Sequence, residues 1–96
     1  IRVRFEENRL TVCGHAGYAA RGEDIVCAAA SALVFALIGS LRQEENLREV
    51  VIRPGYVMLC AGGACAAEFA LVRCGLEQLQ ARYGEFVSVE TTVHGS

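Results

Sequence analysis

The longest apolar run in this 96-residue sequence covers residues 25–41, and no other stretch constrains the fold as strongly. Its apolar side chains would surround a helix on nearly all sides. We therefore predict a helix from residue 25 to about residue 42 that lies deep against a sheet, with Asp24 as its N-cap. The run contains two serines and a glycine and is short for a membrane span, so we expect a core helix.

Short alternations of apolar and polar residues on either side of this helix predict strands. They cover residues 1–5, 10–14, about 50–52, 56–60 and 87–93. Apolar residues at three- and four-residue steps predict a second helix over residues 69–83, with Gly84 just past its end. The expected order is β-β-α-β-β-α-β. We predict one α/β domain of the two-layer α+β type over residues 1–96, with a single mainly antiparallel sheet and both helices on one face.

The composition argues against several functional classes. Hydrophobic residues make up 53% of the chain, which is enough to form a core without disulfides or a metal. Charged residues make up 21% and the formal net charge is −2, so we expect neither nucleic acid nor a membrane surface as a partner. Arg2 and Arg4 interrupt the first apolar run, and we expect no secretory signal peptide.

The cysteines indicate a reduced compartment. There are five, an odd number, and no pair has the C-x-x-C spacing of zinc or redox motifs. We expect a cytoplasmic protein that needs neither a metal nor another cofactor. Four of the five lie in apolar surroundings and are expected to be packing residues: Cys13, Cys60, Cys65 and Cys74.

The fifth cysteine and a histidine form the strongest candidate site. His15 follows an expected strand, and Cys27 would occupy the third helical position if Asp24 caps the helix. Unpaired N–H groups and the helix dipole at that position would favour the thiolate and could bind an oxyanion. A histidine within reach could take the thiol proton and deliver it to a leaving amine.

Neighbouring residues could support this pair. Ser31 lies one turn beyond Cys27 and could donate a hydrogen bond into the site, and Asp24 could orient the imidazole. Residues 16–23 show no period and are expected to form a loop, in which Gly17 and Gly22 relax the backbone and the aromatic Tyr18 could contact a ligand. A cysteine in an alanine-rich helix is also commonly a simple core residue, so the pattern alone leaves both interpretations open.

The chain around this pair carries a specific motif. A glycine precedes the histidine, the cysteine follows twelve residues later, and an aspartate stands three residues before the cysteine. The motif comprises Gly14-His15-Ala16-Gly17-Tyr18, Gly22, Asp24-Ile25-Val26-Cys27-Ala28-Ala29 and Ser31-Ala32-Leu33. The chain resembles the Prp family of ribosomal-processing cysteine proteases in this motif, in residues 1–4 and in the expected order of strands and helices. The resemblance covers nearly the whole chain.

The resemblance implies a small endopeptidase with a Cys-His dyad that acts as a homodimer in the bacterial cytoplasm. Members of the family remove a short N-terminal extension from a large-subunit ribosomal protein by cutting after an aromatic residue. By position, Cys27 would be the nucleophile and His15 the general base and acid. Gly14, Asp24 and Ser31 would support the site.

The same resemblance implies that residues 16–23, with Gly17, Tyr18 and Gly22, form a loop that reshapes around substrate. Two other classes remain open. The domain could be a non-enzymatic, ribosome-associated interaction module in which Cys27 is merely buried. Alternatively, Cys27 could be a redox or acyl-carrying thiol, with Cys13 as the nearest candidate for a resolving cysteine.

Overall fold

The computed structural model describes residues 1–14 and 21–92, with side chains described for residues 1–14 and 25–92. The elements follow the predicted order. They are β1 (Arg2–Glu6), β2 (Arg9–Cys13), α1 (Arg21–Gln43), β3 (Leu47–Arg53), β4 (Tyr56–Ala61), α2 (Ala66–Arg82) and β5 (Ser88–Thr91).

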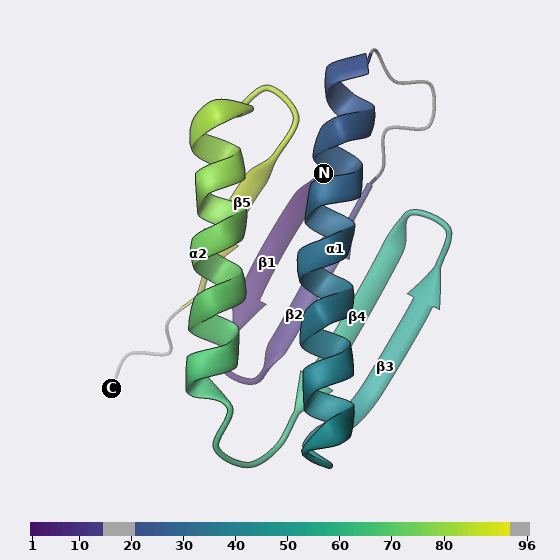
Figure 1. The fold of residues 1–96 in the computed structure, drawn as a ribbon, viewed down its shortest axis with the longest axis vertical. Coiled ribbons are helices and arrows are strands. Elements are labelled where there is room, and N and C mark those ends of the chain that lie inside the picture. Colours follow the sequence, from purple (N-terminus) through teal and green to yellow (C-terminus); the bar gives the residue numbers. More distant parts are fainter. Residues whose placement is uncertain (15–20, 93–96) are drawn as a thin grey trace.

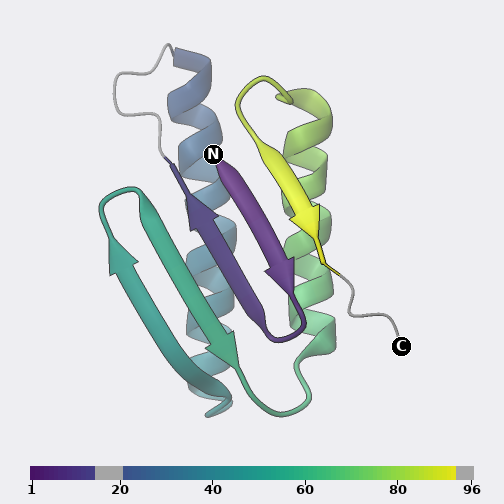
Figure 2. The ribbon, with the colours of Figure 1, turned by 180° about the vertical axis from the view of Figure 1, so that it is seen from behind.

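The strands form one five-stranded sheet in the order β3-β4-β2-β1-β5. Three strand pairs are antiparallel, and β5 joins β1 in parallel. Figure 1 shows both helices on the same face of this sheet, with α2 towards β1 and β5 and α1 beside it towards β4. Figure 2 shows the other face, where the strands are in front of both helices. The predicted two-layer α+β fold with a mainly antiparallel sheet is therefore confirmed.

The alternation of side chains along the strands places the core between the sheet and the helices. Val3 and Phe5 of β1, Leu10 of β2 and Leu59 of β4 are buried there. On α2 the three-residue and four-residue steps bury Phe69, whose ring meets that of Phe5 edge to face at a centroid distance of 6.3 Å.

The two helices also pack closely on each other. Gly75 of α2 faces Leu33 of α1, and a Cβ added at Gly75 would lie only 2.9 Å from Leu33 Cδ1. The absence of a side chain at this position therefore permits the close approach of the helices.

The start of α1 differs from the prediction. The helix begins at Arg21, so Asp24 lies inside its first turn and is not the N-cap, and residues 21–23 are helical instead of part of a loop. A single glycine costs a helix only about 1 kcal/mol relative to alanine, so Gly22 does not prevent the helix from starting earlier.

The burial of α1 is also less complete than its composition indicates. One face packs on the sheet, and its buried side chains are Val26, Ala30, Val34, Leu37, Ile38 and Leu41. The opposite face carries alanines and remains exposed, as do Ile25 and Phe35. The stretch Ile25–Gln43 is long and apolar enough to cross a membrane, with a mean hydropathy of 2.0, but a helix in the core of a soluble protein satisfies the same criterion.

Removal of a core side chain from a central strand should destabilise the fold strongly. Leu10→Ala leaves a cavity in the core between the sheet and the helices, because Leu10 is fully buried on β2. We expect a loss of about 2–5 kcal/mol in the free energy of unfolding. The matched control Leu71→Ala removes the same atoms from a side chain that is 73% exposed on α2, and it should cost less than about 0.5 kcal/mol. Urea denaturation measures both values, and equal losses would contradict this assignment of the core.

Candidate active site

A groove of about 200 Å³ lies between α1 and the β3–β4 hairpin. One wall is the face of α1 that carries Cys27, Ser31 and Phe35, at successive four-residue steps along the helix. The other wall is the end of the hairpin, which contributes Ile52, Arg53, Gly55 and Tyr56. Side chains of the sheet and the helix close the floor: Val12, Ala30, Val34 and Val57. The groove is thus mainly apolar, with a thiol and a hydroxyl on one wall.

Cys27 is half-buried and lies in the second turn of α1. The sequence predicted that it would occupy the third helical position, beside the unpaired N–H groups of the helix start. This prediction is wrong, because only the first four N–H groups of a helix lack intrahelical partners and α1 already begins at Arg21. The backbone N–H of Cys27 is therefore not a free oxyanion donor, and the helix dipole weakens beyond the first turn.

Gly14 closes the groove at the end of β2. Its φ of +86° lies in the left-handed region that favours glycine, so any side chain at this position would strain the backbone. The Gly14 N–H donates a 2.8 Å hydrogen bond to the carbonyl oxygen of Gly55 in the β3–β4 turn. This bond ties the end of β2 to the hairpin wall, immediately before the chain continues to His15.

The structure brings together three of the residues that the sequence singled out, Cys27, Ser31 and Gly14, on one groove. His15, Gly17 and Tyr18 lie outside the described residues. Gly22 and Asp24 lie in the first turn of α1, and the described side chains do not include that of Asp24. The assignment of His15 as the partner of Cys27 therefore stays a prediction.

Sequence reasoning missed the apolar wall residues of this groove. Phe35 follows Cys27 at two four-residue steps on one predicted helix, so the sequence did contain a signal for it. Ile52 and Tyr56 gave no such signal. Their position beside α1 depends on the pairing of β4 with β2, which joins segments far apart in the chain.

The other four cysteines do not share one environment, although all five lie in the described part of the chain and none forms a disulfide. Cys65 is buried in the core, as predicted, whereas Cys74 is exposed on α2 and contacts Gln78. Cys60 is half-buried, and its sulfur accepts a 3.4 Å hydrogen bond from Arg9 Nε, which raises the pKa of that guanidinium. The predicted packing role is thus wrong for Cys74.

The position of Cys13 argues against a redox pair with Cys27. Val12 packs against the core, so the next residue, Cys13, points to the sheet face away from the helices. There it lines a separate cavity with Arg2 and Arg4. The sheet separates this sulfur from the groove that Cys27 lines.

Cys65 should be the most protected thiol among the five. Burial raises the pKa of its thiol, and the nearby Glu68 carboxylate raises it further, because both disfavour the thiolate. Because its pKa is raised, the Cys65 thiol of the folded protein stays neutral in the pH range where an ordinary thiol ionises. In the unfolded chain the same thiol ionises in that pH range. We therefore expect alkylation of Cys65 only after unfolding in urea and ready alkylation of the exposed Cys74, as peptide mass mapping would measure. Equal labelling of the two in the native protein would contradict this burial.

The groove thus offers a half-buried thiol with a hydroxyl on the same wall, in mainly apolar surroundings on a two-layer α+β fold. The family model described as cysteine protease Prp matches residues 1–88, and the chain belongs to this family. Comparison with curated protein sequences gives no significant match.

Solved structures of low sequence identity share the fold. The ribosomal processing protease Prp from S. aureus, in complex with a covalently linked product peptide, is 19% identical with a TM-score of 0.81, and the match covers 96% of this chain and 99% of that one. The same protease with a substrate peptide gives 17% identity, a TM-score of 0.83 and coverages of 95% and 98%. A protein from Streptococcus mutans is 22% identical with a TM-score of 0.77, and the match covers 95% of this chain and 90% of that one.

Proposed function

We propose that this protein is a cysteine endopeptidase that removes the N-terminal extension of a large-subunit ribosomal protein by cutting after an aromatic residue. The observation that supports this proposal most directly is the half-buried Cys27 at an apolar groove of about 200 Å³, in a chain of the cysteine protease Prp family. The S. aureus relative, which has the same fold, is a ribosomal processing protease that binds substrate and product peptides.

In the proposed mechanism the Cys27 thiolate attacks the carbonyl carbon of the scissile peptide bond. His15 takes the thiol proton, and it then delivers that proton to the leaving amine as the carbon–nitrogen bond breaks. The remaining thioester is hydrolysed by a water that His15 deprotonates, which releases the acyl product and restores the thiol.

The supporting residues have proposed roles as well. Ser31 donates a hydrogen bond into the site from the same helix face as Cys27. Asp24, which does not cap α1, orients the His15 imidazole from the preceding turn. Gly14 sets the direction in which the chain enters residues 16–23, and Gly17, Tyr18 and Gly22 contribute to binding of the substrate.

We further propose that residues 1–96 form a single protease domain that works as a homodimer in the cytoplasm. Its partner is the N-terminal peptide of a ribosomal protein. The formal net charge of −2 supports the proposal that the protein does not bind nucleic acid directly. The packing of α1 on the sheet supports the proposal that it has no membrane partner. The proposed chemistry uses a thiol and an imidazole and requires neither a metal nor another cofactor.

The first test is replacement of the proposed nucleophile. Cys27→Ala should abolish cleavage of a ribosomal-protein N-terminal peptide that contains paired phenylalanines, because the acyl-enzyme cannot form. The fold should survive, since Cys27 borders a groove and is only half-buried. His15→Ala should lower the rate nearly as much. Mass spectrometry of the peptide measures both effects, with unchanged circular dichroism as the folding control.

The same experiment contains the outcomes that would overturn the proposal. Cleavage of the peptide by the Cys27→Ala protein would exclude this residue as the nucleophile. A barely changed rate for the His15→Ala protein would exclude the dyad. Cys60→Ala is the matched control, because Cys60 is also half-buried but lies outside the groove, and it should cleave at the unsubstituted rate.

The alternative of a non-enzymatic interaction module requires that Cys27 be an inert, buried residue. Its half-buried position at the groove counts against this alternative. Iodoacetamide under native conditions should label Cys27 faster than the other four cysteines, as time-resolved mass mapping would measure. Labelling of Cys27 no faster than that of the exposed Cys74 would favour the interaction module.

A further inference from the structure

Two of the large exposed apolar side chains share the groove with Cys27. The described part of the chain exposes four such side chains, on Ile25, Phe35, Ile52 and Leu71. Phe35 is 47% exposed and Ile52 is 52% exposed, and both line the groove. Apolar side chains that converge on one cavity from two different elements indicate a binding surface more strongly than isolated ones do.

The strand register explains why Ile52 is exposed. Val50 pairs with Leu59 and Ile52 pairs with Val57, so Ile52 points to the same side of the sheet as the buried Leu59. On an inner strand this direction would put Ile52 in the core. However, β3 is an edge strand, and the side chain of Ile52 remains half-exposed beside α1. The groove therefore lies at the edge of the hydrophobic core, and no side chain of the described residues fills it.

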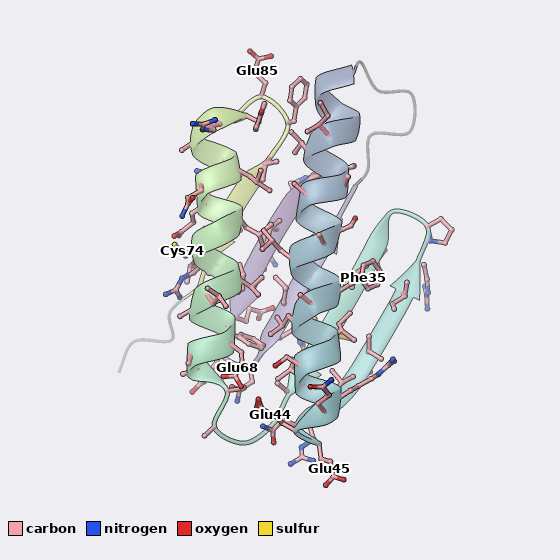
Figure 3. The ribbon with its side chains drawn as sticks, in the orientation of Figure 1. Phe35, Glu44, Glu45, Glu68, Cys74 and Glu85 are labelled. Carbon is pink, nitrogen blue, oxygen red and sulfur yellow. The ribbon has the colours of Figure 1, made fainter. Side chains whose placement is uncertain are left out.

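Phe35 approaches the same space from the helix. Figure 3 shows its side chain on the side of α1 towards the β3–β4 hairpin. Val34 and Val57 form the floor between Phe35 and Ile52, and both contribute only apolar side-chain atoms. This part of the groove therefore suits an aliphatic or aromatic side chain.

The spacing along α1 places this apolar part at a defined distance from the thiol. Phe35 lies two four-residue steps beyond Cys27, which corresponds to about 12 Å of rise along the helix axis. An extended peptide advances about 3.3 Å per residue, so this distance spans between three and four substrate residues.

We propose that Phe35 and Ile52 form a specificity subsite that binds an apolar side chain of the substrate three or four residues from the scissile bond. The subsite lies in the same groove as the thiol, and this continuity makes the substrate peptide its occupant. The proposal rests on the proposed function, because Cys27 defines where the scissile bond lies.

The experiment combines protein variants with a peptide series. The host peptide has paired phenylalanines at the scissile bond and leucines at the other positions, and each leucine is replaced in turn by asparagine. The protein variants are Phe35→Ala and Ile52→Ala, with Leu71→Ala as the matched control outside the groove. For each combination, kcat/KM is measured, and circular dichroism reports folding.

The unsubstituted protein should lose about tenfold in kcat/KM when asparagine occupies the third or fourth position from the scissile bond. Phe35→Ala and Ile52→Ala should each lower kcat/KM for the host peptide by about the same factor. They should also abolish the discrimination against asparagine at that position. The protein and peptide substitutions remove the same contact, so their effects on kcat/KM do not add. Leu71→Ala should change neither kcat/KM for the host peptide nor the discrimination against asparagine. If Phe35→Ala does not fold, Phe35→Leu and Ile52→Val replace the alanine variants with smaller expected losses at the same peptide position.

A binding measurement separates failure of the subsite from failure of the protease function. In the Cys27→Ala background, fluorescence anisotropy gives the Kd of the labelled host peptide without turnover. Efficient cleavage with no effect of either wall substitution would overturn the subsite alone. If the unsubstituted protein does not cleave, a Kd raised about tenfold by Phe35→Ala would still support this peptide site, whereas an unchanged Kd would overturn it.

Discussion

The packing of one face of α1 on the sheet fixes the positions of the described site residues. Val26, Ala30 and Val34 on that face are buried, and they set the rotation of the helix about its axis. With this rotation fixed, the adjacent face, which carries Cys27, Ser31 and Phe35, must turn towards the β3–β4 hairpin. A change in that packing would therefore move the Cys27 thiol, the Ser31 hydroxyl and the Phe35 ring together relative to the hairpin wall.

The groove itself results from incomplete coverage of the sheet. Two helices lie on a sheet of five strands, with α2 towards β1 and β5 and α1 beside it (Figure 1), so the edge strand β3 remains partly uncovered. The hydrogen bond from the Gly14 N–H to the Gly55 carbonyl holds the hairpin against the end of β2. The site is thus built from a rigid helix face on one side and a hairpin that is fixed to a central strand on the other.

The sequence predicted the element order, the two-layer architecture and the motif that places Cys27 and Ser31 on one helix face. Local periodicity carries this information, because alternation and four-residue steps reflect the geometry of strands and helices directly. The predicted start of α1 was wrong, since a favourable capping residue at Asp24 does not exclude a helix that begins earlier. The prediction of Cys74 as a packing residue also failed, because an apolar neighbourhood in the sequence does not specify which helix face is buried.

The sequence by itself determined which segments become strands and helices, and which family the motif resembles. Only the tertiary structure decided that β3 forms an edge, that Ile52 and Phe35 line one groove, and that Cys13 and Cys27 lie on opposite sides of the sheet. The physical reason is that strand order and helix placement depend on contacts between distant segments. β5 pairs in parallel with β1 at one end of the sheet, which leaves β3 at the other, and no local pattern in either strand specifies that arrangement.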